Sequence, residues 1–228
     1  MLAEKFGACV GGKFNADGSV RFFPGNTMVC ILDHSTEVFR RAKAVRTMFE
    51  ESDLAGNLTF LPDESLHMTA IEGVCDQVRD KDHWTSLLPT TAKLVEVDDL
   101  FERLWKEVPM PGKVHMRFEY LRIIGGICIG LYPASFEDDK AMRDWRDLVG
   151  KKMGLWFPGH DRYAFHISLA YGIKPLNEAQ HAEIQKIADD FVEECKRHPF
   201  VFEIPQPSMT YFDNMLFFNT RRIPRKEA

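Results

Sequence analysis

The sequence predicts a mixed α+β fold of two similar lobes, in which concave antiparallel sheets carry helices on their outer side. The first observation is a tetrad of a large apolar residue, histidine, an apolar residue and a hydroxyl. It occurs twice, as "LHMT" at 66–69 and as "FHIS" at 165–168. Around both copies the expected order is strand, helix, loop, tetrad strand, helix and strand. Cys30 precedes His67 by 37 positions (67 − 30), and Cys128 precedes His166 by 38 (166 − 128). Two such units can pack about a pseudo-twofold axis, so that equivalent residues face each other across a cleft.

The first lobe, at about 28–112, follows a turn-rich N-terminal extension at 1–27. Within this extension, "KFNADGSVRFF" predicts a short hairpin closed by an Asn-Ala-Asp-Gly turn. The apolar residues Val38, Ala42, Val45 and Phe49 recur at helical spacing. The expected elements are a strand at 28–32, a helix at 35–52, a strand at 66–74 and one or two helices within 82–108, at "DHWTSLL" and "VDDLFERLWKEV".

The second lobe, at about 113–218, repeats this order. Asn177 is the expected N-cap of its longest helix, and Ile184, Ile187, Ala188 and Phe191 form the apolar stripe of that helix. No linker separates the lobes, so we expect a single domain over residues 1–228. The expected elements are two strands within 113–133 that bend near Gly125 and Gly126, a helix at 137–154, a strand at 164–173, a helix at 177–198, and a strand, turn and strand at 200–218.

The composition favours an ordinary folded protein and argues against several kinds of partner. The chain has 228 residues, of which 45% are hydrophobic and 18 are phenylalanine, so a substantial core is expected. A net charge of −5 argues against coating of DNA or other nucleic acid. No apolar stretch approaches the roughly 20 residues of a membrane helix, and the N-terminus lacks a signal-peptide pattern. The five cysteines are widely spaced and include no CxxC pair, which disfavours disulfides and zinc. We therefore expect a cytoplasmic monomer.

The alternation of side chains along a strand places a histidine and a hydroxyl on one face in each tetrad. His67 shares its face with Thr69, and His166 shares its face with Ser168, while the apolar neighbours point to the core. Either tetrad alone is more typical of an ordinary strand face exposed to solvent. Two tetrads at matched points of a repeat indicate one shared site.

Two facing imidazoles suit the cleavage of a phosphodiester by general acid–base catalysis. The ordinary imidazole pKa of about 6.5 allows one neutral and one charged ring at neutral pH. The neutral ring takes a proton from the attacking water or hydroxyl, and the charged ring gives a proton to the leaving oxygen. The hydroxyls of Thr69 and Ser168 can donate to the non-bridging oxygens. A diester carries one negative charge, so we expect no metal and no other cofactor. Which histidine is the base stays open.

The motifs "HMTA" at 67–70 and "HISL" at 166–169 resemble the two H-x-[T/S]-x motifs of the 2H phosphoesterases, and the resemblance covers most of 28–218. It implies a duplicated LigT-like fold, with His67 and His166 as the catalytic pair and Thr69 and Ser168 as phosphate ligands. Members of the family cleave RNA 2′,3′-cyclic phosphates or ADP-ribose cyclic phosphate without a metal, and some only bind nucleotides. The N-terminal extension looks like that of a bacterial branch of unknown function.

The resemblance leaves substrate and activity open. Many relatives are basic around the cleft and this chain is mildly acidic, so a small cyclic phosphate or nucleotide is favoured over long RNA, with an RNA end as another candidate. A metal-independent cyclic phosphodiesterase and a nucleotide sensor without turnover would use the same four residues. His160-Asp161 resembles part of a metal site but has no third ligand at suitable spacing. Possible substrate contacts, each with a core, turn or surface role as the alternative, are Tyr171, Phe23, Asn26, Thr27, Trp156 and Arg122.

Overall fold

The computed structural model describes residues 5–222 and residue 224. Within them it confirms a mixed α+β fold that is built from two similar halves. The first half contains β1 (Gly25–Ile31), α1 (Glu37–Glu50), β2 (Leu58–Phe60), β3 (His67–Cys75) and α2 (Leu94–Trp105). The second half contains β4 (His115–Ile123), β5 (Gly126–Pro133), α3 (Phe136–Met153), β6 (His166–Gly172), α4 (Glu178–Arg197), β7 (Val201–Glu203) and β8 (Ser208–Phe212).

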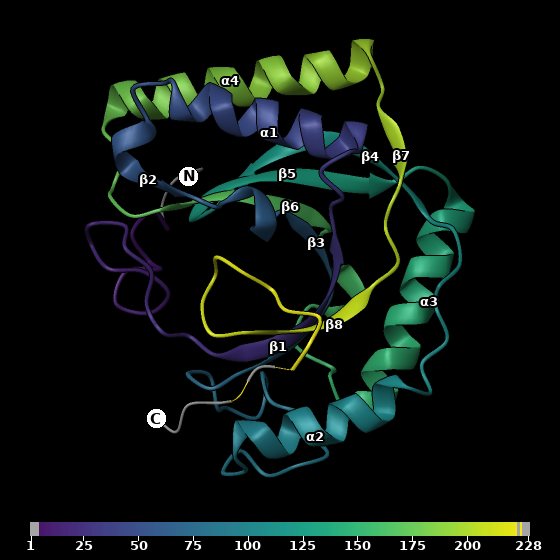
Figure 1. Ribbon diagram of the computed structural model, residues 1–228. Helices are drawn as coiled ribbons and strands as arrows, with labels where there is room; N and C mark the ends of the chain where they lie inside the picture. The colour runs from purple at the N-terminus through teal and green to yellow at the C-terminus, as the bar shows by residue number, and fades with distance from the viewer. Residues whose placement is uncertain (1–4, 223, 225–228) are drawn as a thin grey trace.

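The strands form one eight-stranded antiparallel sheet in the order β7-β4-β5-β6-β3-β1-β8, with β2 paired to β6. The two halves meet where Met68 of β3 lies opposite Ile167 of β6. These are the residues directly after the two tetrad histidines, so the pseudo-twofold axis passes between the tetrads. Figure 1 shows the sheet curled around a hollow, with the helices on its outside.

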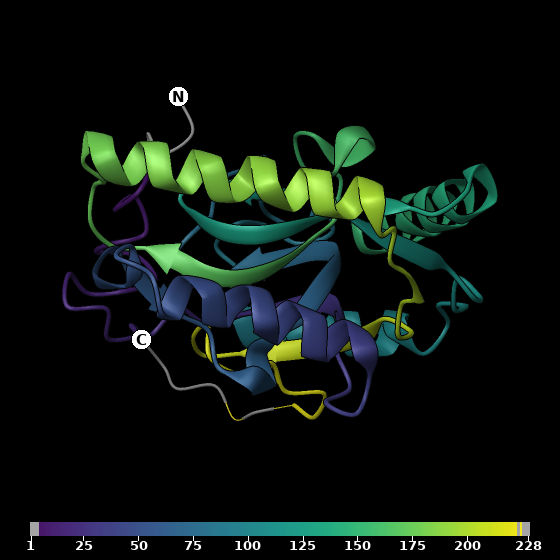
Figure 2. The same ribbon diagram turned by 90° about the horizontal axis from the view of Figure 1, so that it is seen from above.

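The helices form where the sequence supplies caps and an apolar stripe. The Thr36 side chain caps α1, and Asn177 caps α4 in a capping box with Gln180. Figures 1 and 2 show α1 and α4 on one side of the sheet and α2 and α3 elsewhere around it. α1 packs on β6, which belongs to the other half, and α3 packs on both β3 and β5. Each half therefore covers the tetrad strand of the other, and most of the buried apolar residues form one large cluster.

The strand register corrects the cysteine alignment that the spacing suggests. Val29 lies opposite Thr69, and Cys128 lies opposite Ser168, so Cys128 is the equivalent of Val29 and not of Cys30. A shift of one residue moves a side chain to the other face of a strand. Cys30 is accordingly buried in the core, whereas the Sγ atom of Cys128 lies 3.5 Å from the Ser168 hydroxyl.

Within 82–108 the structure has one helix, α2, which the expectation of one or two helices allows; three local details still differ from the expected elements. Residues 82–88 form no helix, because their polar groups bond to the end of α3: Thr85 donates to the Met153 carbonyl, and the Ser86 amide donates to Gly154. The short strand β2 was not expected. The predicted N-terminal hairpin forms no strands and closes through one bridge between Phe14 and Val20.

A second apolar cluster lies within the hollow, apart from the main core. We call it the inner cluster; its buried members are Phe14, Phe23, Leu61, Ile173, Phe212, Met215 and Phe218. Most come from the segments before β1 and after β8; Figure 1 shows the first in purple at the left edge of the sheet and the second in yellow within its curve. Across the described residues, no helix combines the length and the apolar character that crossing a membrane requires.

Candidate active site

A cavity of about 260 Å³ lies in the hollow where β3 and β6 meet. His67 and Thr69 of the first tetrad and His166 and Ser168 of the second all line it. Their apolar neighbours point into the core, since Leu66, Met68, Phe165 and Ile167 are all buried. Both tetrads therefore contribute their polar face to one cavity.

The two imidazoles are held in the same way. Nδ1 of His67 lies 2.7 Å from the Ser65 carbonyl oxygen, and Nδ1 of His166 lies 2.8 Å from the Ala164 carbonyl oxygen. A carbonyl oxygen only accepts, so each Nδ1 carries the proton and each neutral ring has its lone pair on Nε2. Each carbonyl belongs to the residue two positions before its histidine. The duplication thus repeats the tautomer as well as the position.

The surroundings keep both rings neutral in the free protein. Burial lowers the pKa of His67 to about 4, although the Ser65 carbonyl raises it, and the proximity of His166 lowers it further. Burial also lowers the pKa of His166; the Ala164 carbonyl opposes this change, and the positive charges of Arg122 and Lys13 add to it. Desolvation disfavours a charged imidazole. An anion that enters the cavity would favour the protonated form of either ring.

Thr69 and Ser168 have different neighbours. The Tyr163 hydroxyl lies close enough to the Thr69 side chain for the two to interact, and the Tyr163 ring lies 4.2 Å from the guanidinium carbon of Arg146. Arg146 is buried, donates to the Ala70 carbonyl and has its pKa lowered by this burial to about 10. α3 therefore supports Tyr163 next to Thr69 through Arg146, while the hydroxyl of Ser168 has the thiol of Cys128 beside it.

Matching β-bulges extend the cavity lining beyond the tetrads. On β3, Ala70 is the extra residue between the pairs Met28–Ile71 and Val29–Thr69; on β6, Leu169 is the extra residue in the same place. A bulge reverses the alternation of side chains. It returns Glu72 and Tyr171, each five positions after its histidine, to the cavity. Strict alternation along the strand would direct Tyr171 away from the histidines, and the bulge at Leu169 reverses this direction.

Phe23, Asn26 and Thr27 also line the cavity, but their roles differ. Phe23 belongs to the inner cluster. The Asn26 side chain donates to Asp98 at 2.8 Å and accepts from the Val74 amide at 3.1 Å. The Thr27 hydroxyl donates to the Ile71 carbonyl at 3.1 Å. Because these polar atoms serve internal hydrogen bonds, Asn26 and Thr27 hold β1 against β3 and are poorly placed to bind substrate.

Trp156 and Arg122 are absent from the described lining of the cavity. The Trp156 ring is half exposed and stacks on His160 with a centroid distance of 4.0 Å, because its loop turns back towards α3. Arg122 lies on β4, and its Nη1 atom approaches Nδ1 of His166 to 3.3 Å. Both atoms carry protons, so this contact acts through charge and not as a hydrogen bond.

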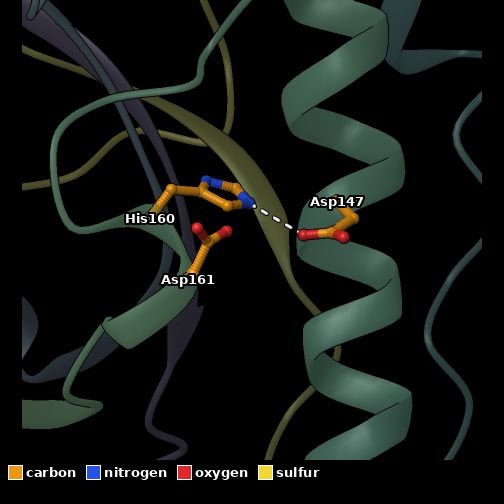
Figure 3. A group of neighbouring side chains, drawn as sticks. All are labelled: Asp147, His160 and Asp161. Atoms are coloured by element: carbon orange, nitrogen blue, oxygen red, sulfur yellow. Dashed lines mark hydrogen bonds and ion pairs between the residues drawn. The ribbon is translucent and has the colours of Figure 1, made fainter.

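Asp147 joins His160 and Asp161 in a cluster outside this cavity, shown in Figure 3. Their ligand atoms lie within 4.8 Å of one another, and Nε2 of His160 is 3.1 Å from Asp147. The third ligand that the sequence spacing lacks thus comes from α3. The nearby Arg146 charge, which lowers the pKa of His160, also disfavours a metal cation there. The His160–Asp147 contact instead ties the loop that carries Tyr163 to α3.

The sequence patterns did not predict several residues of the cavity lining, among them Lys13, Glu72, Tyr163 and Phe218. Lys13 and Phe218 come from the segments that flank the duplicated part, and Tyr163 comes from a loop. Sequence spacing does not reveal where such segments lie. Glu72 did carry a signal, because the repeat that aligns His67 with His166 also aligns Glu72 with Tyr171.

Comparisons with known proteins identify a family and a similar fold. The model of the family described as 2H-phosphodiest, Domain of unknown function (DUF1868), matches residues 13–126. Among solved structures, the chain is similar to the crystal structure of the conserved protein of unknown function ATU0111 from Agrobacterium tumefaciens str. C58. The TM-score is 0.86 at 28% sequence identity, and the match covers 95% of this chain and 94% of that chain. No curated protein matches the chain.

Proposed function

Because the chain belongs to the 2H-phosphodiesterase family of unknown function (DUF1868), we propose that it hydrolyses a cyclic phosphodiester, with His67 and His166 as general base and general acid. The observation that carries the proposal is the matched pair of imidazoles in one cavity. In each ring a backbone carbonyl fixes the proton on Nδ1. Each histidine is also followed, two positions further along its strand, by a hydroxyl that lines the same cavity.

The different surroundings of the rings support His67 as the base. With a pKa of about 4, His67 is unprotonated at neutral pH and can take a proton from the attacking water at Nε2. The water oxygen forms a bond to phosphorus, and the bond from phosphorus to one ring oxygen breaks. His166, protonated once the phosphate anion lies beside it, gives its Nε2 proton to that leaving oxygen. Proton exchange with solvent then restores both rings.

The hydroxyls of Thr69 and Ser168 are assigned to the non-bridging oxygens of the phosphate. These oxygens gain negative charge in the transition state, so donors that are already in place stabilise it more than the ground state. The tetrads flank the two sides of the pseudo-twofold axis. This arrangement supports acid and base roles on opposite sides of phosphorus, as an in-line displacement requires.

The size and charge of the site favour a small substrate. A cavity of about 260 Å³ lies near the lower end of the roughly 300–1,000 Å³ typical of ligand pockets. The chain carries a net charge of −5, which disfavours a long polyanion. We therefore assign a cyclic nucleotide or a nucleotide-sugar cyclic phosphate as the substrate class, ahead of an RNA end.

The test is a turnover panel on purified protein in excess chelator. The panel contains 2′,3′-cyclic mononucleotides, ADP-ribose cyclic phosphate and a short RNA with a cyclic phosphate end, with products followed by ³¹P NMR. We expect hydrolysis of a small cyclic phosphate to one monoester isomer, because one histidine protonates one leaving oxygen. Tight binding with no turnover of any compound would contradict the proposal and favour a nucleotide-binding domain that uses the same cavity.

A further inference from the structure

We propose that Lys13 forms an anion subsite beside the histidine pair, and that the substrate carries a second anionic group, a phosphate monoester, which this lysine binds. This inference rests on the proposed function and narrows its substrate class. It concerns a residue of the N-terminal extension, outside the duplicated part of the fold.

The first observation is that Lys13 has no carboxylate partner within residues 5–222. Its side chain is half-buried in the cavity lining, and Nζ lies 5.1 Å from the Tyr171 ring centre and 5.6 Å from that of Phe23. Its hydrogen bond to the Tyr171 hydroxyl is long, at 3.4 Å. Among the residues that the structure describes, no carboxylate forms an ion pair with Nζ. Aromatic faces offset only part of the cost of desolvating an ammonium group, so this charge still favours an anion.

The second observation is that the segment around Lys13 is built to hold it in place. The Lys13 amide donates to the Cys9 carbonyl, and its own carbonyl accepts from the Arg21 amide, both at 2.9 Å. The next residue, Phe14, is fully buried in the inner cluster, with its ring 5.1 Å from that of Tyr171. Because the backbone at Lys13 is already fixed, only the freedom of the side chain is lost when the lysine binds a ligand.

The third observation is the polarity of the cavity. Lys13 lies at the end bordered by Tyr171 and is close enough to His166 to lower the pKa of that ring. The equivalent of Tyr171 at the other end is Glu72. An anionic group is therefore attracted at the Tyr171 end and repelled at the Glu72 end. This asymmetry gives one orientation to a substrate with two anionic groups.

The experiment compares two product-like ligands, a nucleoside 2′-phosphate and the corresponding nucleoside 2′,5′-bisphosphate, by titration calorimetry. Neither ligand needs turnover. We expect the wild-type protein to bind the bisphosphate at least about tenfold more tightly, which is the size of one charge-assisted hydrogen bond. Lys13→Met, which keeps the aliphatic stem, should abolish this preference and leave the affinity for the monophosphate unchanged. Lys13→Arg should retain most of it.

The matched control is Lys174→Met, which removes one exposed lysine just after β6, outside the cavity lining. It should leave both affinities unchanged. Thermal unfolding checks that Lys13→Met is folded. If it is not, Lys13→Gln takes its place, and the salt dependence of the wild-type protein is measured as well. The preference for the bisphosphate should shrink as the salt concentration rises.

Each other outcome is decisive. Equal affinity of the wild-type protein for the two ligands, or a bisphosphate preference that survives in Lys13→Met, would overturn the subsite. If Lys13→Met weakened the binding of both ligands equally, the lysine would bind the phosphate that lies between the two histidines. The proposal that the substrate carries a second anionic group would then be overturned. A preference that depends on Lys13, in a protein that hydrolyses nothing in the turnover panel, would keep the subsite and overturn the proposed catalysis.

Discussion

The two ends of the cavity have the same backbone and different surroundings. At each end a histidine donates from Nδ1 to the carbonyl two positions earlier, a hydroxyl follows two positions later, and a bulge returns the fifth residue to the cavity. The His67 end is completed by Phe218 and Glu72, while Tyr163 lies between Thr69 and the His166 ring, whose centre is 6.1 Å from its own.

The His166 end is completed by Lys13 and Tyr171, and Arg122 approaches the Nδ1 side of the ring from outside the lining. The completing residues at both ends come largely from loops, terminal segments and neighbouring strands, which the repeat does not match. The comparison teaches that duplication positions two equivalent reactive groups, and that the unduplicated segments make them unequal.

The largest expected effect tests whether the two ends act as one site. His67→Ala and His166→Ala should each lower kcat/KM by about 10² to 10⁴, the contribution of a positioned acid or base. The double variant should lose little more than either single one, because the two rings act as a unit. Steady-state kinetics on the best cyclic phosphate of the panel measures this.

His198→Ala, which removes an exposed histidine at the end of α4, is the matched control and should leave kcat/KM unchanged. If either cavity variant kept most of the activity, the two ends would not form a catalytic pair.

An intermediate effect sharpens the comparison at the hydroxyls. Ser168→Ala should lower kcat by about a hundredfold, as the loss of one transition-state donor does. Thr69→Val should cost only about tenfold, because the Tyr163 hydroxyl lies beside Thr69 and can donate in its place. Thr69→Val combined with Tyr163→Phe should lower kcat by about as much as Ser168→Ala does.

Thr69→Ser and Ser168→Thr are the conservative controls and should keep most of the activity. Equal effects of Thr69→Val and Ser168→Ala, with no further loss in the combined variant, would show that Tyr163 does not substitute for the threonine.

The smallest expected effect is a shift in the pH dependence of kcat/KM that arises at the His67 end of the cavity. His67 must be unprotonated to act as the base, and its lowered pKa places the acidic limb of kcat/KM below the ordinary value of about 6.5, towards 4. The Phe218 ring packs on His67 at 4.3 Å and helps to exclude water. Phe218→Ala should therefore move the acidic limb up towards 6.5, with a several-fold loss of rate at pH 5 and little change at pH 7.5.

Phe217→Ala is the matched control, since Phe217 is exposed and lies outside the cavity. A limb that stays in place in Phe218→Ala would mean that Phe218 does not control the hydration of His67. The same lowered pKa predicts a free energy of unfolding that is unaffected by His67 above about pH 6.5 and falls as the pH drops towards 4, because the unfolded chain then binds more protons.

Much of the central site follows from local rules in the sequence. Alternation along a strand is enough to place His67 with Thr69, and His166 with Ser168, away from their buried neighbours. The repeat then implies that the two faces meet. Helix limits were also predictable, because caps such as Asn177 and apolar stripes lie within a few residues of each other.

Features that depend on strand register or on distant segments could not be read from the sequence patterns. The equivalence of Cys30 and Cys128 was wrong by one position, and the alternation at Tyr171 was reversed by a bulge at Leu169. A bulge depends on how one strand pairs with its neighbour, which spacing within one strand does not encode. Asn26 and Thr27 carry polar groups that fit a binding site, and only the fold reveals that these groups are already bonded.

The sequence by itself determined the fold class, the duplication and the four polar residues at the centre of the cavity, because periodicity and repetition are properties of the chain read in order. The tertiary structure decided that Lys13 and Phe218, far apart in sequence, flank those residues at opposite ends. It thereby decided which imidazole is the more strongly deprotonated and where an anion is favoured. Desolvation and charge depend on distances in space, and the folded packing of the terminal segments sets those distances.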